Sequence, residues 1–156
     1  MSRDEFERLW KMHFPAVTRT AYLILGDSHE ARDIAQEAFT RAFQHWRKVS
    51  RLDCPEGWVH RVAANLAVSA CRRRALTRVE PQLTVGGPEP PDDELARAVA
   101  ALTPAQRAVI AMRFYLDWSV DDVAHALGKR PGTVRALTHQ AMERLRRDLS
   151  EGRRDG

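Results

Sequence analysis

The sequence predicts an all-α protein of two small helical domains joined by a flexible linker. Three observations lead to this prediction. Apolar residues recur at three- and four-residue steps in both halves of the chain, helix caps precede several of these runs, and a segment rich in proline and glycine separates the halves. With 156 residues, 44% of them hydrophobic, the chain suits one medium domain or two small ones.

The first helical run shows an apolar face with a proline in its middle. We expect a kink, or a break into two helices, at Pro15 because proline removes one helix hydrogen bond. The apolar residues of this face are Phe6, Leu9, Trp10, Phe14, Val17, Ala21, Ile24 and Leu25.

The second run opens at Asp27, with Glu30 three residues on, which is a capping-box pattern. Its apolar stripe comprises Ala31, Ile34, Ala35, Ala38, Phe39, Ala42, Phe43 and Trp46, and its opposite face carries Asp33, Gln36, Glu37, Arg41 and Gln44. Taken alone, the periodicity favours a solvated face on which Glu37 and Arg41 form an i,i+4 ion pair.

The third run, from Pro55 to Arg74, begins with proline at a helix-opening position. Trp58, Val62, Ala63, Leu66 and Ala70 are expected inward, and the donor-bearing residues around them are His60, Arg61, Asn65, Ser69, Arg72, Arg73 and Arg74. Cations beside aromatic rings favour unpaired or melting nucleic acid. Three arginines at a helix C-terminus that complement its dipole fit equally well.

Charge divides the chain into two basic segments around an acidic connector. Residues 1–78 hold fourteen Lys and Arg against nine Asp and Glu, 79–103 hold one against five, and 104–156 hold ten against seven. The stretch VEPQLTVGGPEPPDD, residues 79–93, has four prolines and two adjacent glycines, so it neither continues a helix nor buries much surface. We interpret it as the linker.

The second half shows helix start signals in close succession. A short helical pattern over 92–102 places Leu95, Val99 and Leu102 on one face. Thr103, Pro104 and Gln106 then form a capping box, with Val109, Ile110 and Phe114 expected inward. Ser119 caps the next helix, whose inward residues are Val120, Val123, Ala124 and Leu127.

The spacing of Ala124, Gly128 and Val134 predicts a helix-turn-helix. Helices that cross at a wide angle need a small residue at their closest approach, a residue that tolerates the turn and an apolar anchor on the second helix. Pro131 opens that second helix, and Val134, Leu137 and Ala141 are expected to anchor it.

The start of this second helix and the turn before it carry the candidate duplex-binding residues. These are Lys129, Arg130, Thr133, Arg135, Ala136 and His139. Recognition helices present their first turns to base edges, so Arg135 is the best candidate for a base contact. Thr133 and the local amides could instead hold a phosphate. We favour a solvated basic helix end for Arg144, Arg146 and Arg147.

The sequence shows no sign of a membrane span, a catalytic site or a metal site. No apolar run approaches the length of a span, and residues 1–11 are too charged for a signal peptide, which favours a cytoplasmic protein. Cys54 and Cys71 lack a CxxC partner, so we expect reduced thiols and no metal. The six histidines are scattered and no nucleophile elbow or phosphate loop occurs, so we expect neither enzymatic activity nor a cofactor.

Three stretches resemble sigma-70-type transcription initiation factors. SHEARDIAQEAFTRAFQHW (28–46) is similar to region two of that family, and PEGWVHRVAANLAVSACRRR (55–74) resembles the helix that follows it. ALTPAQRAVIAMRFYLDWSVDDVAHALGKRPGTVRALTHQAMERLR (101–146) resembles region four. No large segment separates the two regions, which points to the small extracytoplasmic-function (ECF) group.

The resemblance implies a division of labour. A region two domain, residues 1–78, would bind core RNA polymerase and the proximal promoter element, and a region four domain, residues 94–150, would read the upstream element. Linker 79–93 would lie along the polymerase toward the RNA exit path.

The resemblance also implies site residues. Polymerase docking would fall to Asp33, Ile34, Gln36, Glu37 and Phe39. Single-stranded proximal DNA would meet the loop 49–55 and His60, Arg61, Asn65, Ser69, Arg72 and Arg73. Upstream duplex DNA would meet Lys129, Arg130, Thr133, Arg135, Ala136 and His139.

The partners implied are core RNA polymerase, promoter DNA and an anti-sigma factor of the kind that holds many ECF factors inactive.

The chain departs from the family at Ser69, where many relatives have aspartate, at residues 136–138, and at Gln140, where relatives are often basic. These departures imply fewer phosphate contacts from the second domain. The alternative is a stand-alone helix-turn-helix regulator of the response-regulator output type, which would bind duplex DNA tightly without polymerase.

Overall fold

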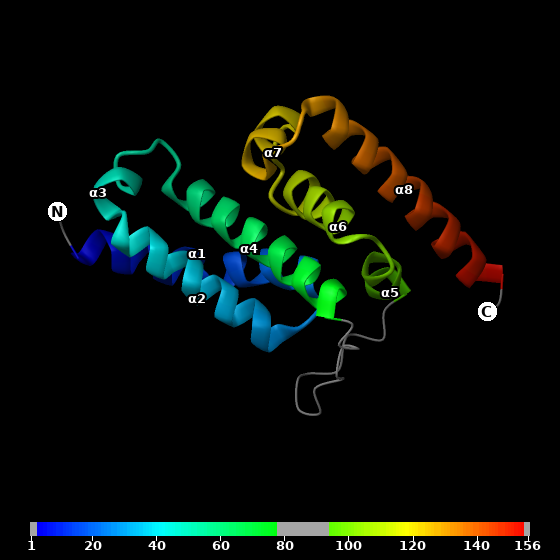
Figure 1. The fold of residues 1–156 in the computed structure, drawn as a ribbon, viewed down its shortest axis with the longest axis horizontal. Helices are drawn as coiled ribbons and strands as arrows, with labels where there is room; N and C mark the ends of the chain where they lie inside the picture. Colours follow the sequence, from blue (N-terminus) through cyan, green and yellow to red (C-terminus); the bar gives the residue numbers. More distant parts are fainter. Residues whose placement is uncertain (1–2, 78–93, 155–156) are drawn as a thin grey trace.

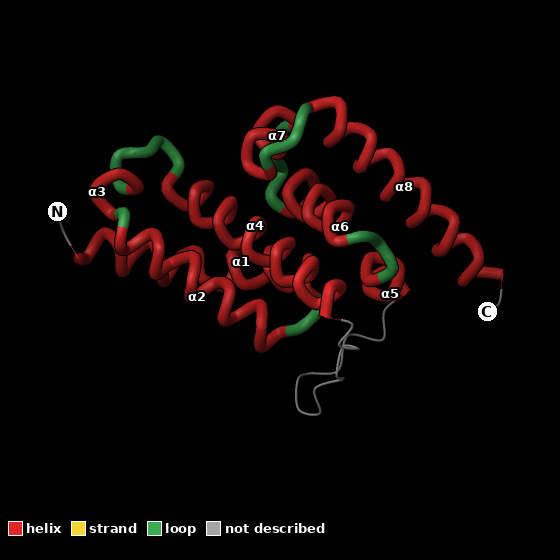
Figure 2. Tube along the Cα trace, in the orientation of Figure 1, coloured by secondary structure: helices red, strands yellow, loops and turns green. Residues whose placement is uncertain are grey.

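The computed structural model describes residues 3–77 and 94–154, and every regular element in those residues is a helix (Figure 1, Figure 2). The first half contains α1 (Arg3–Leu25), α2 (Ser28–Gln44), α3 (Trp46–Val49) and α4 (Pro55–Thr77). The second half contains α5 (Glu94–Ala100), α6 (Pro104–Ile110), η1 (Ala111–Tyr115), α7 (Val120–Leu127) and α8 (Pro131–Arg154). The all-α prediction is therefore confirmed, and the linker predicted at 79–93 lies outside the described residues.

The first half is a bundle of α1, α2 and α4. Alanines at the contact let the helices approach closely, and its core cluster contains Val17, Ala35, Ala38, Phe39, Ala42, Val49, Val59 and Ala63. The Asp27 carboxylate caps α2 by accepting from the backbone N–H groups of His29 and Glu30. Glu30 pairs instead with Arg74 of α4, so only one side of the predicted capping box forms.

Of the kink or break expected at Pro15, the break does not occur. Helix α1 runs unbroken from Arg3 to Leu25 with Pro15 inside it. Side chains on both sides of the proline, such as Phe6 and Val17, pack into the same core. This packing outweighs the one hydrogen bond that proline removes.

In the second half, α6 and α7 begin at the N-cap residues that the sequence predicted. Thr103 and Gln106 form both bonds of a capping box, and the Ser119 hydroxyl accepts from the Asp122 N–H. Gly128 ends α7 in the left-handed region at φ +64°, as the turn requires. Between α5 and α8, Ala98, Leu102, Ala141 and Leu145 form a small core.

A π-helical turn, η1, follows α6 and corrects the expected position of Phe114. The ring was expected inward, but it is 56% exposed, and Ala111 and Met112 are buried instead. The Leu116 N–H bonds to the Ala111 carbonyl five residues back. This wider turn inserts one extra residue, so the helical periodicity used for the prediction shifts after Ile110.

The two halves pack directly against each other, in what we call the closed arrangement. Figure 1 shows α6 and α7 beside α4, and α1 and α4 both contact α6. One core cluster spans the two halves, and its members include Ala21, Ile24, Ala64, Ala67, Val68, Val109, Met112, Val123 and Val134. The division into domains at 78 and 94 remains a prediction, but the described halves share buried surface.

Candidate nucleic-acid and partner interfaces

The start of α8 presents an open surface for a duplex. Arg130, Thr133, Arg135, Ala136 and His139 are exposed there, and Lys129 is half-buried in the turn. Val134 is fully buried beneath them, and it fixes the rotation of the helix. In the first turn of α8, the backbone N–H groups of Gly132 and Thr133 lie at the positive end of the helix dipole, before the helical hydrogen bonds begin. The surface therefore suits phosphate and base edges together.

The turn before α8 has the contacts that the predicted helix-turn-helix requires. Ala124 is buried at the contact, and its carbonyl accepts from the Lys129 N–H at 2.9 Å. The predicted roles of Ala124, Gly128 and Val134 in the helix-turn-helix are confirmed. On the outer face of α8, His139 lies 3.2 Å from the Glu143 carboxylate, so that histidine already has an acidic neighbour.

The hydrogen-bond donors of helix α4 lie in two different environments. Ser69, Arg72 and Arg73 are exposed toward the C-terminal end of the helix. Closer to its start, the Asn65 amide donates from Nδ2 to the Ala126 carbonyl of α7 at 2.8 Å. Arg61 Nη1 lies 3.5 Å from His125 Nε2, also on α7. Of the predicted proximal-element residues, Arg61 and Asn65 therefore contact α7.

His60 is buried rather than displayed on the surface. Its side chain is 5% exposed, its Nδ1 lies 3.0 Å from the Thr20 hydroxyl, and the Trp118 ring packs edge-on against it. Burial lowers the pKa of His60 from 6.5 to about 4, with the positive charge of His13 adding to the effect. In the closed arrangement His60 is a neutral packing residue that offers no positive charge to DNA.

The polar face of α2 is open. Asp33, Gln36 and Glu37 are exposed, Ile34 is half-buried, and Phe39 is buried beneath the face. The predicted ion pair is present, with Arg41 Nε 3.1 Å from Glu37 Oε1. Such exposed pairs contribute little stability, so both side chains remain available to a partner.

An aromatic cavity next to this face was not predicted from the sequence. It has a volume of about 830 Å³ and is lined by Arg3, Phe6, Glu7, Trp10, Gln36, Phe39, Thr40, Phe43 and Trp46. Phe43 was expected inward with the stripe of α2, but it is 57% exposed at the cavity. Helix α2 ends one residue later, and Trp46 begins the separate helix α3, so the stripe does not continue through Trp46.

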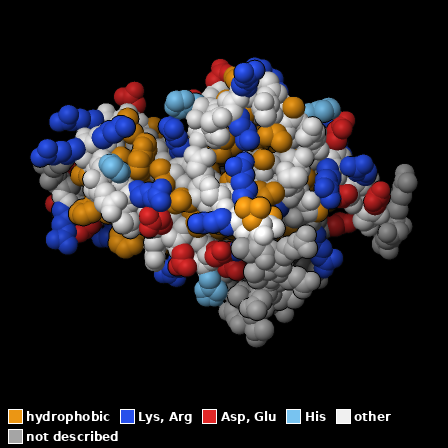
Figure 3. Space-filling view, in the orientation of Figure 1, with side chains coloured by type: hydrophobic (Ala, Val, Ile, Leu, Met, Phe, Trp, Pro, Cys, Tyr) orange, Lys and Arg blue, Asp and Glu red, His pale blue; other side chains and the backbone are white. Residues whose placement is uncertain are grey.

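Figure 3 shows hydrophobic side chains among Lys and Arg side chains at the end of the molecule that carries α3. Within the cavity, the Phe6 ring packs against Phe43 and Trp46 with centroids 5.1 and 5.4 Å apart. Because Gln36 and Phe39 belong both to this cavity and to the predicted docking set, the cavity extends that face of α2.

Residues 3–77 and 94–154 hold neither a candidate metal site nor a candidate membrane span. No group of His, Cys, Asp and Glu in these residues is arranged to hold a metal ion. The described helices include none with the length and hydropathy of a membrane span.

The two cysteines differ in exposure. Cys54 is an exposed free thiol and Cys71 a buried one. Partial desolvation and the Glu56 carboxylate raise the pKa of the Cys54 thiol.

Comparison with known proteins decides the family. Residues 9–77 match Sigma-70 region 2, and residues 92–145 match Sigma-70 region 4. The ECF RNA polymerase sigma factor SigL of Mycobacterium tuberculosis is 32% identical, over 92% of this chain and 88% of the relative. The chain belongs to the sigma-70 family, in its ECF group. Its function is that of an RNA polymerase sigma factor in transcription initiation, and this family is not a class of enzymes.

A second relative agrees with the family assignment, and a solved structure shows a similar fold. The RNA polymerase sigma-E factor of Streptomyces coelicolor is 29% identical, over 93% of this chain and 86% of the relative. The sigma factor RpoE, solved in complex with the anti-sigma factor NepR from Bartonella quintana, has a similar fold with a TM-score of 0.71. That likeness covers 94% of this chain and 97% of the solved chain at 20% identity.

Proposed function

We propose that three helix faces of this sigma factor divide promoter recognition and polymerase binding among them. The observation that carries this proposal is the position of polar surfaces on three helices that fall within the matched sigma regions. Those on α2 and at the start of α8 are open, and that of α4 is open toward its C-terminal end. The acidic face of α2, with Asp33 and Glu37, docks on core RNA polymerase. The donor-rich face of α4 binds the proximal element, and the start of α8 binds the upstream element.

The α4 surface suits separated strands. Arg72 and Arg73 lie toward its end and supply charge for phosphates, while the Asn65 amide and the Ser69 hydroxyl offer hydrogen bonds to base edges. Bases held there after strand separation offset part of the cost of unstacking them. His60 belongs to this surface only if the neighbouring half of the chain moves away.

The α8 surface suits duplex DNA. Arg135 projects from the second turn of a helix whose first turn is open, the position from which recognition helices reach base edges. Lys129 and Arg130 in the preceding turn bind phosphates and set the register. Two separated contacts on one chain raise the overall affinity for a promoter without demanding high affinity at either site.

The chain performs no bond chemistry of its own, and polymerisation belongs to its partner. An anti-sigma factor is a further proposed partner, supported by the complex in which the structurally similar RpoE was solved.

Charge reversal on α2 tests the docking face. Asp33→Lys and Glu37→Lys should each weaken binding to core RNA polymerase about tenfold, because a repulsive charge replaces a complementary one. Fluorescence anisotropy of the labelled chain measures this affinity, and circular dichroism should show unchanged helix content since both residues are exposed.

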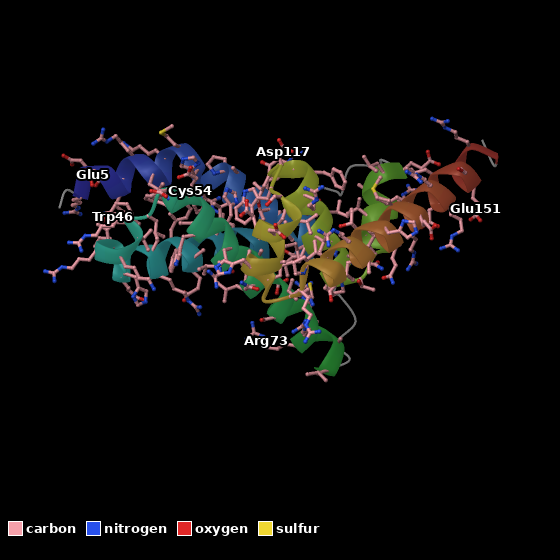
Figure 4. All side chains as sticks on the ribbon, turned by 90° about the horizontal axis from the view of Figure 1, so that it is seen from above. Glu5, Trp46, Cys54, Arg73, Asp117 and Glu151 are labelled. Atoms are coloured by element: carbon pink, nitrogen blue, oxygen red, sulfur yellow. The ribbon has the colours of Figure 1, made fainter. Side chains whose placement is uncertain are left out.

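Glu151→Lys is the matched control. It makes the same charge change on an exposed residue at the far end of α8, and Figure 4 shows Glu151 at the opposite end of the molecule from Glu5 and Trp46. Wild-type affinity in both α2 variants would place the polymerase contact elsewhere. An equal loss in all three would show a nonspecific charge effect.

A further inference from the structure

We propose that Arg107 latches the chain in the closed arrangement, and that breaking this latch releases Asn65 and Arg61 from α7 for binding to DNA. The release for DNA rests on the proposed function. The latch itself rests on contacts within the chain.

The Arg107 guanidinium uses all three of its nitrogens. Nε donates to the Ile24 carbonyl of α1 at 2.7 Å. Nη1 donates to the Ala100 carbonyl at 3.2 Å and also to the Leu102 carbonyl, and Nη2 lies 3.7 Å from Cys71 Sγ of α4. One side chain of α6 therefore joins the ends of α1 and α5 to α4, across the boundary between the halves.

The acceptors of this latch explain why an arginine suits the position. Carbonyls in the last turn of a helix have no helical donor and lie at the negative end of the dipole, so a cation is favoured beside them. Ile24 and Ala100 are such carbonyls, at the ends of α1 and α5. A planar group with five donors can satisfy several of them at once, whereas lysine cannot span the same set.

The rest of the boundary is less specific. Its apolar core includes small side chains, such as Ala21, Ala64 and Ala67, together with Val109 and Met112. Non-directional packing of this kind does not fix one arrangement as a set of hydrogen bonds does. Directional contacts that hold α6 and α7 on the first half include those of Arg107, the Asn65 bond to Ala126 and the contact of Arg61 with His125.

Contacts across the same boundary restrict the access of DNA to side chains of α4. The Ala126 carbonyl lies 2.8 Å from Asn65 Nδ2, and Trp118 packs over His60. Asn65 is exposed, but a base that takes the donor bonded to Ala126 has to replace that carbonyl, and His60 becomes accessible only after Trp118 leaves. Capture of separated strands by α4 and separation of the two halves are coupled events in this arrangement.

Cys71 supplies a reporter for the opening of the boundary. Its side chain is 8% exposed beside Arg107, and Cys54 can be replaced by serine so that Cys71 is the single thiol of the chain. The rate of its modification by N-ethylmaleimide then follows the population in which the boundary is open. Arg107→Met, which keeps an apolar stem but no donor, should raise this rate about tenfold.

Two further variants separate opening from unfolding. Arg146→Met removes an exposed arginine of α8 and should leave the rate unchanged. Val59→Ala weakens the core of the first half, and it should raise the rate only in step with global unfolding measured by circular dichroism. A rate in Arg107→Met within about twofold of its parent would overturn the latch. So would a parent Cys71 that reacts as fast as the thiol of the urea-unfolded chain.

Core RNA polymerase tests the release. Mass spectrometry of the Cys71 peptide should show faster modification when the Cys54→Ser chain is bound to core polymerase. A bound chain whose Cys71 stays protected would contradict the release step while leaving the proposed function intact. A chain that does not bind polymerase would contradict the proposed function and the release together, whereas the effect of Arg107→Met on the unbound chain stands apart from both.

Discussion

His60 shows how burial changes the chemistry of a residue that the sequence places among surface donors. Its neighbours along α4 are arginines and an amide, but the ring lies between Thr20 and Trp118, which come from α1 and from the second half. Burial disfavours the imidazolium form, so the histidine adds packing rather than charge. The surrounding residues are distant in sequence, which is why periodicity could not reveal this.

The buried His60 makes stability depend on pH. In the unfolded chain this histidine takes up a proton near pH 6.5, whereas in the folded chain it does so only at about pH 4. The unfolded state thus binds more protons between these values, so stability falls as pH falls through this window. The free energy of unfolding should be about 1–2 kcal/mol lower at pH 5 than at pH 7.

Urea denaturation at the two pH values measures this difference, with His60→Gln as the comparison. Glutamine keeps a polar group near Thr20 but does not titrate, so the gap between pH 5 and pH 7 should shrink. An unchanged gap in His60→Gln would assign the pH dependence to other groups.

The features that could be predicted at single residues are those that depend only on neighbouring residues in the sequence. The capping box of Thr103 and Gln106 and the left-handed Gly128 depend on residues at most a few positions apart. The bond from Asn65 to Ala126 joins residues 61 positions apart in the sequence. It depends on how the two halves meet, and a single sequence carries no local signal for that.

At the scale of the elements, the turn between α7 and α8 determines where the DNA-binding surface at the start of α8 lies. Gly128 adopts φ +64°, and a Cβ there would meet nothing within 4 Å. Gly128→Ala should therefore lower the free energy of unfolding by about 1 kcal/mol through backbone strain alone. Thermal or urea denaturation measures the change.

Gly132 offers the opposite control within the same motif. It lies in the first turn of α8 with ordinary backbone angles and open space at its Cβ position, so Gly132→Ala should stabilise the chain by about 0.5 kcal/mol. Equal effects of the two substitutions would contradict the assignment of strain to the turn.

Element boundaries were well predicted where caps exist and poorly predicted where packing intervenes. Thr103 and Ser119 begin α6 and α7 as expected. The π-helical turn at η1 exposes Phe114, and the end of α2 exposes Phe43, although both rings follow an apolar periodicity. A periodic pattern assumes one uninterrupted helix, so it fails where a turn widens or a helix stops.

For the whole molecule, two helical regions were predictable but their contact was not. Both halves carry a net positive charge, which gives no electrostatic reason for them to associate. The residues of the shared core, such as Ala64 and Val109, also fit the internal apolar faces of their own helices. The closed arrangement therefore arises from packing surfaces that each half presents in addition to its own core.

Transcription with purified components tests the function of the whole molecule most directly. Core RNA polymerase is supplied with a pool of promoter fragments from the native genome, with and without the purified chain, and run-off transcripts are mapped. The proposed division of labour predicts transcripts from a defined subset of promoters only when the chain is present. Identical transcripts with and without it, together with tight duplex binding by the chain alone, would contradict that function and favour a stand-alone DNA-binding regulator.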